Sequence, residues 1–140
     1  MSREDAVVLP FSLTLRVRFA ETDAMGVVHH AAYLPYLEAA RVEYLRAIGH
    51  PYDAVRELDR VDFVVTGVRL DYLAPALFDE QLAIGVGLKS FSKVRFTMRY
   101  RIDRAETPIA RGETLHAVLD RTTGRPSRVP CWFEDVPLVG

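Results

Sequence analysis

The sequence lacks the features of secreted proteins, membrane-spanning proteins and serine hydrolases. It contains one cysteine, Cys131, so no disulfide can form within the chain, which fits a reducing compartment. No apolar run approaches the roughly 18 residues that a membrane-spanning helix needs, and the first residues lack the pattern of a signal peptide. No G-x-S-x-G stretch surrounds any of the five serines, which disfavours Ser-His-Asp hydrolysis. We therefore expect a cytoplasmic protein.

Lysine is scarce as well, because 16 of the 18 basic residues are arginine and only Lys89 and Lys93 are lysine. The formal net charge of −1 does not predict a nucleic-acid-binding surface. Arginine forms two-pronged contacts with carboxylates and phosphates, so its excess suits ion pairs or a phosphate ligand, although a biased genome composition explains it equally well. The length of 140 residues and the 49% apolar content predict a single domain over residues 1–140.

The spacing of apolar residues predicts one strand, one long helix and then four more strands. Residues 12–19 alternate between polar and apolar, and the apolar side chains on the shared face are Leu13, Leu15, Val17 and Phe19. From Tyr33 to Ile48 apolar residues recur every three or four positions, which predicts a helix that Gly49 ends. A weaker helical pattern covers residues 51–59, and from residue 62 onward the period is two. The short connections in this later part favour antiparallel neighbours, so we expect an α+β fold.

The connection between the first strand and the helix carries two carboxylates, Glu21 and Asp23, and the adjacent histidines His29 and His30. Together with the helix that follows, the stretch ETDAMGVVHHAAYLPYLEAAR resembles the hotdog-fold acyl-CoA thioesterases, specifically the 4-hydroxybenzoyl-CoA thioesterase family and its Tol-Pal-associated bacterial relatives. The residues that carry this resemblance are Thr22, Asp23, Gly26, Val27, Val28, His30, Tyr33, Glu38 and Arg41. The likeness continues through the later strands and covers nearly the whole chain.

The resemblance implies a hotdog fold, in which a five-stranded antiparallel sheet wraps around one long central helix. It also implies a homodimer, or a homotetramer built from two dimers, with active sites at the dimer interface. The expected reaction is hydrolysis of a small or medium acyl-CoA thioester to the free acid and CoA. CoA is part of the substrate, so no separate cofactor is expected.

In that family, the carboxylate that corresponds to Asp23 attacks the thioester carbonyl or activates a water that does so. A backbone N–H at the position of His30 stabilises the oxyanion, and the His30 side chain either assists the reaction and orients the substrate or simply packs. The other positions expected to shape the oxyanion hole or to position the substrate are Gly26, Val27, Tyr33 and Glu38. Taken alone, Asp23 is more often a turn or helix-capping residue, and the surrounding motif is what favours catalysis. Glu21 is expected to have a supporting role at most.

The phosphates of CoA predict cationic and hydroxyl contacts on surface turns. The candidates lie in the turn KSFSK and near the end of the chain: Lys89, Ser90, Ser92, Lys93, Arg125 and Arg128. Ordinary solvated charges explain each of them equally well. No metal site is expected, because His29 and His30 point in different directions and no Cys/His cluster follows. Neither His50 nor His116 has an acid–base partner that the sequence reveals.

Two other functions stay open. A hotdog enoyl-CoA hydratase or dehydratase pairs a histidine with a carboxylate, but its typical Asp-x-Asn-Pro-x-His signature differs from the Asp-Ala-Met-Gly found here. A non-catalytic acyl-binding module would hold an acyl chain without cleaving it. The sequence does not distinguish CoA from acyl carrier protein as the carrier, and it does not identify the acyl group.

Overall fold

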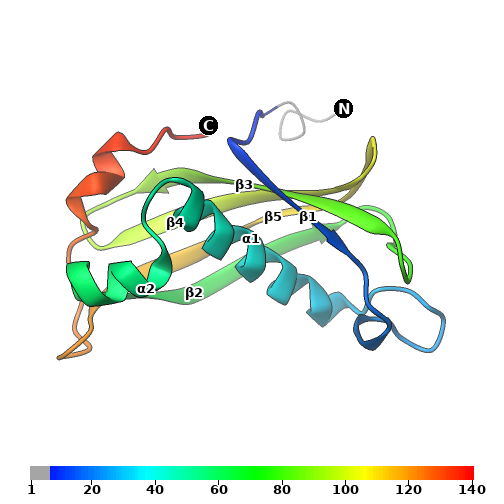
Figure 1. Ribbon diagram of the computed structural model, residues 1–140, viewed down its shortest axis with the longest axis horizontal. Coiled ribbons are helices and arrows are strands. Elements are labelled where there is room, and N and C mark those ends of the chain that lie inside the picture. Colours follow the sequence, from blue (N-terminus) through cyan, green and yellow to red (C-terminus); the bar gives the residue numbers. More distant parts are fainter. Residues whose placement is uncertain (1–6) are drawn as a thin grey trace.

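The computed structural model describes residues 7–140 and consists of one antiparallel sheet curved around one long helix (Figure 1). The strands lie in the order β1-β3-β4-β5-β2, and all neighbouring pairs are antiparallel. Their bounds are β1 (Phe11–Arg16), β2 (Val61–Tyr72), β3 (Gln81–Phe91), β4 (Arg95–Arg104) and β5 (Thr107–Asp120). The predicted α+β class, with five antiparallel strands and one long helix, is confirmed.

The long helix α1 (Tyr33–Ala47) ends at the predicted glycine. Gly49 adopts a φ of 91°, and the next N–H, of His50, donates to the Leu45 carbonyl (2.9 Å), which satisfies one of the last carbonyls of the helix. Shorter helical segments are η1 (Phe19–Glu21), η2 (His30–Ala32), α2 (Tyr52–Ala54), the π-helical η3 (Val55–Asp59) and η4 (Cys131–Asp135). The helical pattern over residues 51–59 is thereby confirmed. Within residues 7–140, no helix has both the length and the apolar composition needed to cross a membrane.

The core lies between α1 and the sheet. The buried part of the predicted helix stripe is Tyr33, Leu37, Ala40 and Tyr44, whereas Ile48 at its end is only partly buried. The alternation in β4 is also as predicted, because its inward side chains are at most 4% exposed: Phe96, Met98, Tyr100 and Ile102. One face of the sheet is thus closed by α1, which begins at the connection that carries the polar residues.

The first strand was predicted to extend too far, because residues 17–19 lie beyond its end. β1 ends at Arg16, Val17 is still buried, and Phe19 is 73% exposed within η1. The chain turns away from the sheet because the side chain of Glu21 accepts a hydrogen bond from the backbone N–H of Arg18 (2.9 Å). Phe19 packs instead on the ring of Phe78, with 5.5 Å between the ring centroids.

Candidate active site

The loop between β1 and α1 is built around Asp23. Its N–H donates to the Val27 carbonyl (2.8 Å), and Gly26, at a φ of 75°, donates its own N–H to the Asp23 carbonyl (3.0 Å). The carboxylate oxygen Oδ1 accepts hydrogen bonds from the N–H groups of Met25 (2.8 Å) and Val27 (3.2 Å). The other oxygen, Oδ2, has no hydrogen-bond partner among residues 7–140, and the residue is exposed. Asp23 therefore stabilises the turn with Oδ1, and its Oδ2 is left free of hydrogen bonds within residues 7–140.

The turn η2 follows this loop and leads into α1. His29 caps it, because Nδ1 of His29 accepts the N–H of Ala31 (3.2 Å) and its carbonyl accepts the N–H of Ala32 (2.9 Å). The N–H of His30 makes no hydrogen bond within residues 7–140. By contrast, Gly26 and Val27, which were predicted near the oxyanion, donate their N–H groups within the loop. His30 thus has the free donor that a developing oxyanion needs.

Tyr72 is a residue at this site that the sequence did not single out. It stands at the end of β2, and its hydroxyl donates to the carbonyl of His30 (3.0 Å) across 42 positions of the chain. Its ring also lies against that of the buried Tyr33, with centroids 5.4 Å apart. Tyr72 therefore restrains the peptide group that begins η2.

Glu21 is turned away from the loop. Its carboxylate accepts hydrogen bonds from the Tyr36 hydroxyl (2.7 Å) and from Nε (2.9 Å) and Nη2 (2.6 Å) of Arg18. Partial burial acts to raise the pKa of Glu21, but hydrogen bonds from Arg18 and Tyr36 outweigh it and hold the pKa below its usual value. Glu21 is thus an anion whose carboxylate is bonded to Arg18 and Tyr36.

An open groove of about 350 Å³ runs between this loop and the end of β2. Its lining includes three of the predicted site residues, Val27, His30 and Tyr33, together with Tyr72. Glu38, another predicted site residue, does not line this groove, because it lies on α1 beyond the first turn. The structure therefore brings most of the predicted positioning residues to one end of α1 and separates Glu38 from them.

Comparison with known proteins identifies the family. A sequence model described as the thioesterase-like superfamily matches residues 17–136. This chain belongs to the thioesterase-like superfamily. It is 35% identical over 121 residues to an acyl-CoA thioester hydrolase, YbgC, of Escherichia coli O157:H7, which covers 86% of this chain and 90% of the relative. It is also 33% identical over 111 residues to a putative esterase of Aquifex aeolicus, covering 79% of this chain and 86% of the relative.

A solved structure has the same fold. The crystal structure of a probable thioesterase from Bartonella henselae matches with a TM-score of 0.81 and 29% identity, over 86% of this chain and 98% of that one. The predicted hotdog fold, the relationship to acyl-CoA thioesterases and the class of enzyme, a thioester hydrolase, are confirmed by these relatives. The roles of the individual site residues stay predictions.

The residues predicted to contact CoA were expected in surface turns, and only some of them lie there. Lys89 and Ser90 are not in a turn, because β3 continues through a bulge to Phe91. The ammonium group of Lys89 lies 2.5 Å from the carboxylate of Glu113, so this cation already has a partner. Ser92 and Lys93 do form the turn between β3 and β4.

The two predicted groups of CoA contacts meet at one end of the sheet. The N–H of Val129, next to Arg128, donates to the carbonyl of Lys93 (2.9 Å), and Arg125 lies exposed in the turn that follows β5. This end lies opposite the Asp23 loop, which follows the other end of the sheet (Figure 1). The predicted CoA contacts and Asp23 are therefore at opposite ends of the sheet within one chain. Residues 7–140 contain no group of three or more potential metal ligands.

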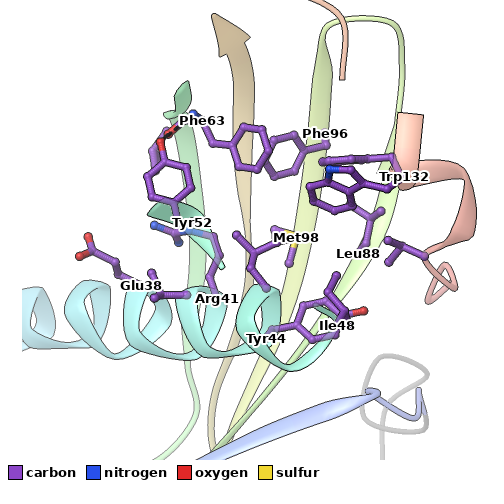
Figure 2. A pocket seen from close by; sticks show the side chains of 15 residues that line it. Glu38, Arg41, Tyr44, Ile48, Tyr52, Phe63, Leu88, Phe96, Met98 and Trp132 are labelled. Carbon is purple, nitrogen blue, oxygen red and sulfur yellow. Dashed lines mark hydrogen bonds between the residues drawn. The ribbon is translucent and has the colours of Figure 1, made fainter. Parts of the chain in front are cut away.

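Glu38 lines a second hollow, which we call the α1 cavity (Figure 2). It has a volume of about 290 Å³ and lies between the second half of α1, the sheet and η4. Its walls are Glu38, Arg41, Val42, Tyr44, Leu45, Ile48, Tyr52, Phe63, Val65, Leu88, Phe96, Met98, Trp132, Phe133 and Val136. Except for Glu38 and Arg41 these are apolar or aromatic residues, which is the usual lining of a small-molecule site.

Proposed function

We propose that this protein hydrolyses acyl-CoA thioesters and that the free Oδ2 of Asp23 acts at the thioester carbonyl. One observation carries the proposal: two backbone N–H groups hold Oδ1, while Oδ2 is unbonded within residues 7–140. A carboxylate held in this way presents one oxygen in a constant position, and the positioning of a reacting group is a large part of catalysis. The Escherichia coli relative, named an acyl-CoA thioester hydrolase, supports acyl-CoA as the substrate class.

Two chemical routes use this same oxygen. In the first, Oδ2 adds to the carbonyl carbon, CoA leaves as the thiolate and takes up a proton, and water cleaves the resulting anhydride. In the second, Oδ2 removes a proton from a water molecule as that water adds to the carbonyl carbon. Both routes pass through a tetrahedral oxyanion, and both yield the free acid and the CoA thiol.

The oxyanion is stabilised by the unbonded N–H of His30 in this proposal. Tyr72 supports that role, because its hydrogen bond to the His30 carbonyl (3.0 Å) restrains the turn that carries the N–H. The N-terminal end of α1 follows directly, and its dipole favours negative charge in the same place. Asp23, as the nucleophile or base, and His30, as the oxyanion donor, therefore lie seven residues apart on one connection.

A second copy of the chain completes the site in our proposal. β2 is an edge strand, and its apolar residues Val65, Val68 and Tyr72 are 48%, 45% and 52% exposed. Two copies that pair antiparallel through β2 place the Tyr72 end of one strand beside the Val61 end of the other. The Asp23 loop of one copy then lies near the α1 cavity and the turn at Lys93 of the other. The acyl group and the CoA phosphates can be received there.

The test is thiol release from a panel of short-chain, medium-chain and aromatic acyl-CoAs. Asp23→Asn keeps an oxygen that can accept the N–H groups of Met25 and Val27, but it removes the charge. We expect kcat to fall about a hundredfold or more, as losses of charged catalytic groups commonly do. Asp53→Asn is the matched control, because Asp53 is an exposed carboxylate that also accepts a backbone N–H, from Ala54 (2.9 Å).

Each alternative has its own result in the same experiment. Equal thiol release by the parent and Asp23→Asn would contradict the assignment of Asp23. A change in enoyl absorbance without thiol release would identify a hydratase. Binding of one acyl-CoA per chain without cleavage would identify an acyl-binding module.

A further inference from the structure

The α1 cavity contains a cation in a mostly apolar setting. Of its fifteen lining residues only Glu38 and Arg41 are charged, and Glu38 is exposed at the surface. Both side chains extend from α1 (Figure 2), and no ion pair joins the two residues. The guanidinium of Arg41 is therefore surrounded in the cavity mostly by aliphatic and aromatic side chains, and it makes no ion pair with Glu38, the one acid in the lining.

Arg41 has one hydrogen-bond partner within residues 7–140, the hydroxyl of Tyr100, which accepts from Nη1 at 3.1 Å. No carboxylate in the same part of the chain pairs with it. A guanidinium has five N–H donors, and a partly buried cation is costly unless an anion or several acceptors satisfy it. Most of its donor capacity is thus left for a ligand that enters the cavity.

Arg41 is held in place by a buried polar chain. The Tyr100 hydroxyl lies 2.6 Å from Oγ1 of Thr114, which lies 2.7 Å from Nε2 of His116. Arg41 can only donate, so the Tyr100 hydroxyl accepts from it and keeps its own proton available for Thr114, whose proton is then available for Nε2 of His116. The guanidinium is thus anchored on a hydroxyl and not on a carboxylate.

The position of Arg41 within the cavity defines how a ligand would lie. The cavity reaches the surface beside Glu38 and Val65, which are both exposed, and Arg41 lies one helical turn from Glu38. Other walls come from the buried Met98 and the partly buried Trp132 (Figure 2). A ligand with an anionic head near the mouth and an apolar tail inside matches this arrangement.

Cavity size limits the tail. An apolar cavity of about 150 Å³ accepts benzene, so the roughly 290 Å³ found here suits about eight to ten carbons. We propose that the α1 cavity binds a free carboxylic acid of about this size, with its carboxylate on Arg41 and its tail against Met98 and Trp132. Arginine binds carboxylates in two-pronged, charge-assisted hydrogen bonds, which distinguishes an acid from an alcohol of equal length.

Trp132 provides the measurement, because it is the single tryptophan of the chain and lines the cavity. Its indole N–H is bound to Asp59 (3.1 Å) and its ring stacks on His50 at 4.0 Å, so it is held in one place. We would titrate the full chain with decanoate and follow tryptophan fluorescence, with acetate and decanol as the ligands that lack a tail or a charge. Decanoate should give a saturable change, and decanol should bind about tenfold more weakly or worse.

Variants of Arg41 and Val42 distinguish how the carboxylate and the apolar tail of the ligand contribute to binding. Arg41→Met should weaken decanoate binding about tenfold or more and leave decanol binding nearly unchanged, whereas Arg41→Lys should keep part of the preference. Arg46→Met is the matched control, because Arg46 is on the same helix, is exposed and pairs with Glu43 (3.3 Å). Val42→Phe, which reduces the cavity and keeps Arg41, should shift the preference to shorter acids. Circular dichroism checks that each variant is folded. If Arg41→Met is not folded, Arg41→Lys is used in its place.

The proposal is overturned if decanoate gives no saturable signal, if decanol binds as tightly as decanoate, or if the folded Arg41 variants bind decanoate as the parent does. It does not depend on the proposed reaction. Thiol release without decanoate binding would remove this inference alone, and decanoate binding without thiol release would remove the proposed function alone. When both hold, the free acid is the reaction product, and decanoate should inhibit the parent but not Arg41→Met.

Discussion

Mild acid should destabilise the fold through the buried His116 of β5. This side chain is 1% exposed and lies flat against Phe96, with 4.5 Å between the ring centroids. Burial lowers the pKa of His116 to about 3, and the nearby positive charge of Arg41 acts in the same direction. A histidine in the unfolded chain takes up its proton near pH 6.5. Between these two values the unfolded state binds more protons, so stability falls as the pH falls from about 6.5 towards 3.

The expected size of the effect follows from these two pKa values. Each pH unit inside the window costs about 1.4 kcal/mol, so acidification from pH 7.5 to 5.0 should remove about 2 kcal/mol through His116. Urea unfolding of the parent, followed by circular dichroism at the two pH values, measures the total loss. Glu21 and Glu113 also have lowered pKa values and contribute to the acid sensitivity, mostly at lower pH.

The variant His116→Gln isolates the histidine. Glutamine keeps an acceptor for the Thr114 hydroxyl but does not titrate, whereas the acidic residues are common to both proteins. We expect the variant to be less stable than the parent at pH 7.5 and to lose about 2 kcal/mol less on acidification. If parent and variant lose the same free energy of unfolding, His116 is not held neutral and the reasoning is wrong.

Two further changes test particular contacts. Tyr72→Phe removes the hydrogen bond to the His30 carbonyl, so kcat for thiol release should fall about tenfold while KM changes little; an equal kcat would exclude a positioning role. Gly112→Ala places a methyl group against the backbone carbonyl of Arg69 on the neighbouring strand, which must shift. The free energy of unfolding in urea should fall by about 2 kcal/mol, and an unchanged midpoint would show that β2 adapts without cost.

Most of the fold could be predicted from local spacing. A period of two identifies β4 because its alternate side chains face α1, and the spacing of three and four identifies α1 because one of its faces packs on the sheet. The failure at Phe19 has a local cause, since the hydrogen bonds between Glu21 and Arg18 divert a chain whose alternation continues. Lys89 was placed in a turn because a β-bulge, which lengthens β3, leaves no clear signal in the spacing.

The residues of the candidate site could also be predicted only in part from the sequence. Asp23 and His30 could be named from the sequence because they lie on one connection, within a motif that carries the family resemblance. The hydrogen bonds that Asp23 and His30 make could not be predicted from the sequence. That Asp23 has one free oxygen depends on the loop geometry. That Tyr72 reaches His30 depends on where the end of β2 lies relative to η2, 42 positions earlier in the chain.

The sequence by itself predicted most of the elements from short-range periodicity, their antiparallel arrangement from short connections, and the thioesterase relationship from one continuous motif. Only the tertiary structure decided what surrounds the functional groups. Arg41 meets Tyr100 across 59 positions, and Tyr100 meets Thr114 across 14, at registers set by the whole sheet. The volume and the charge of the α1 cavity arise from side chains on α1, β2, β3, β4 and η4 together, and no local pattern in the chain records how closely those elements pack.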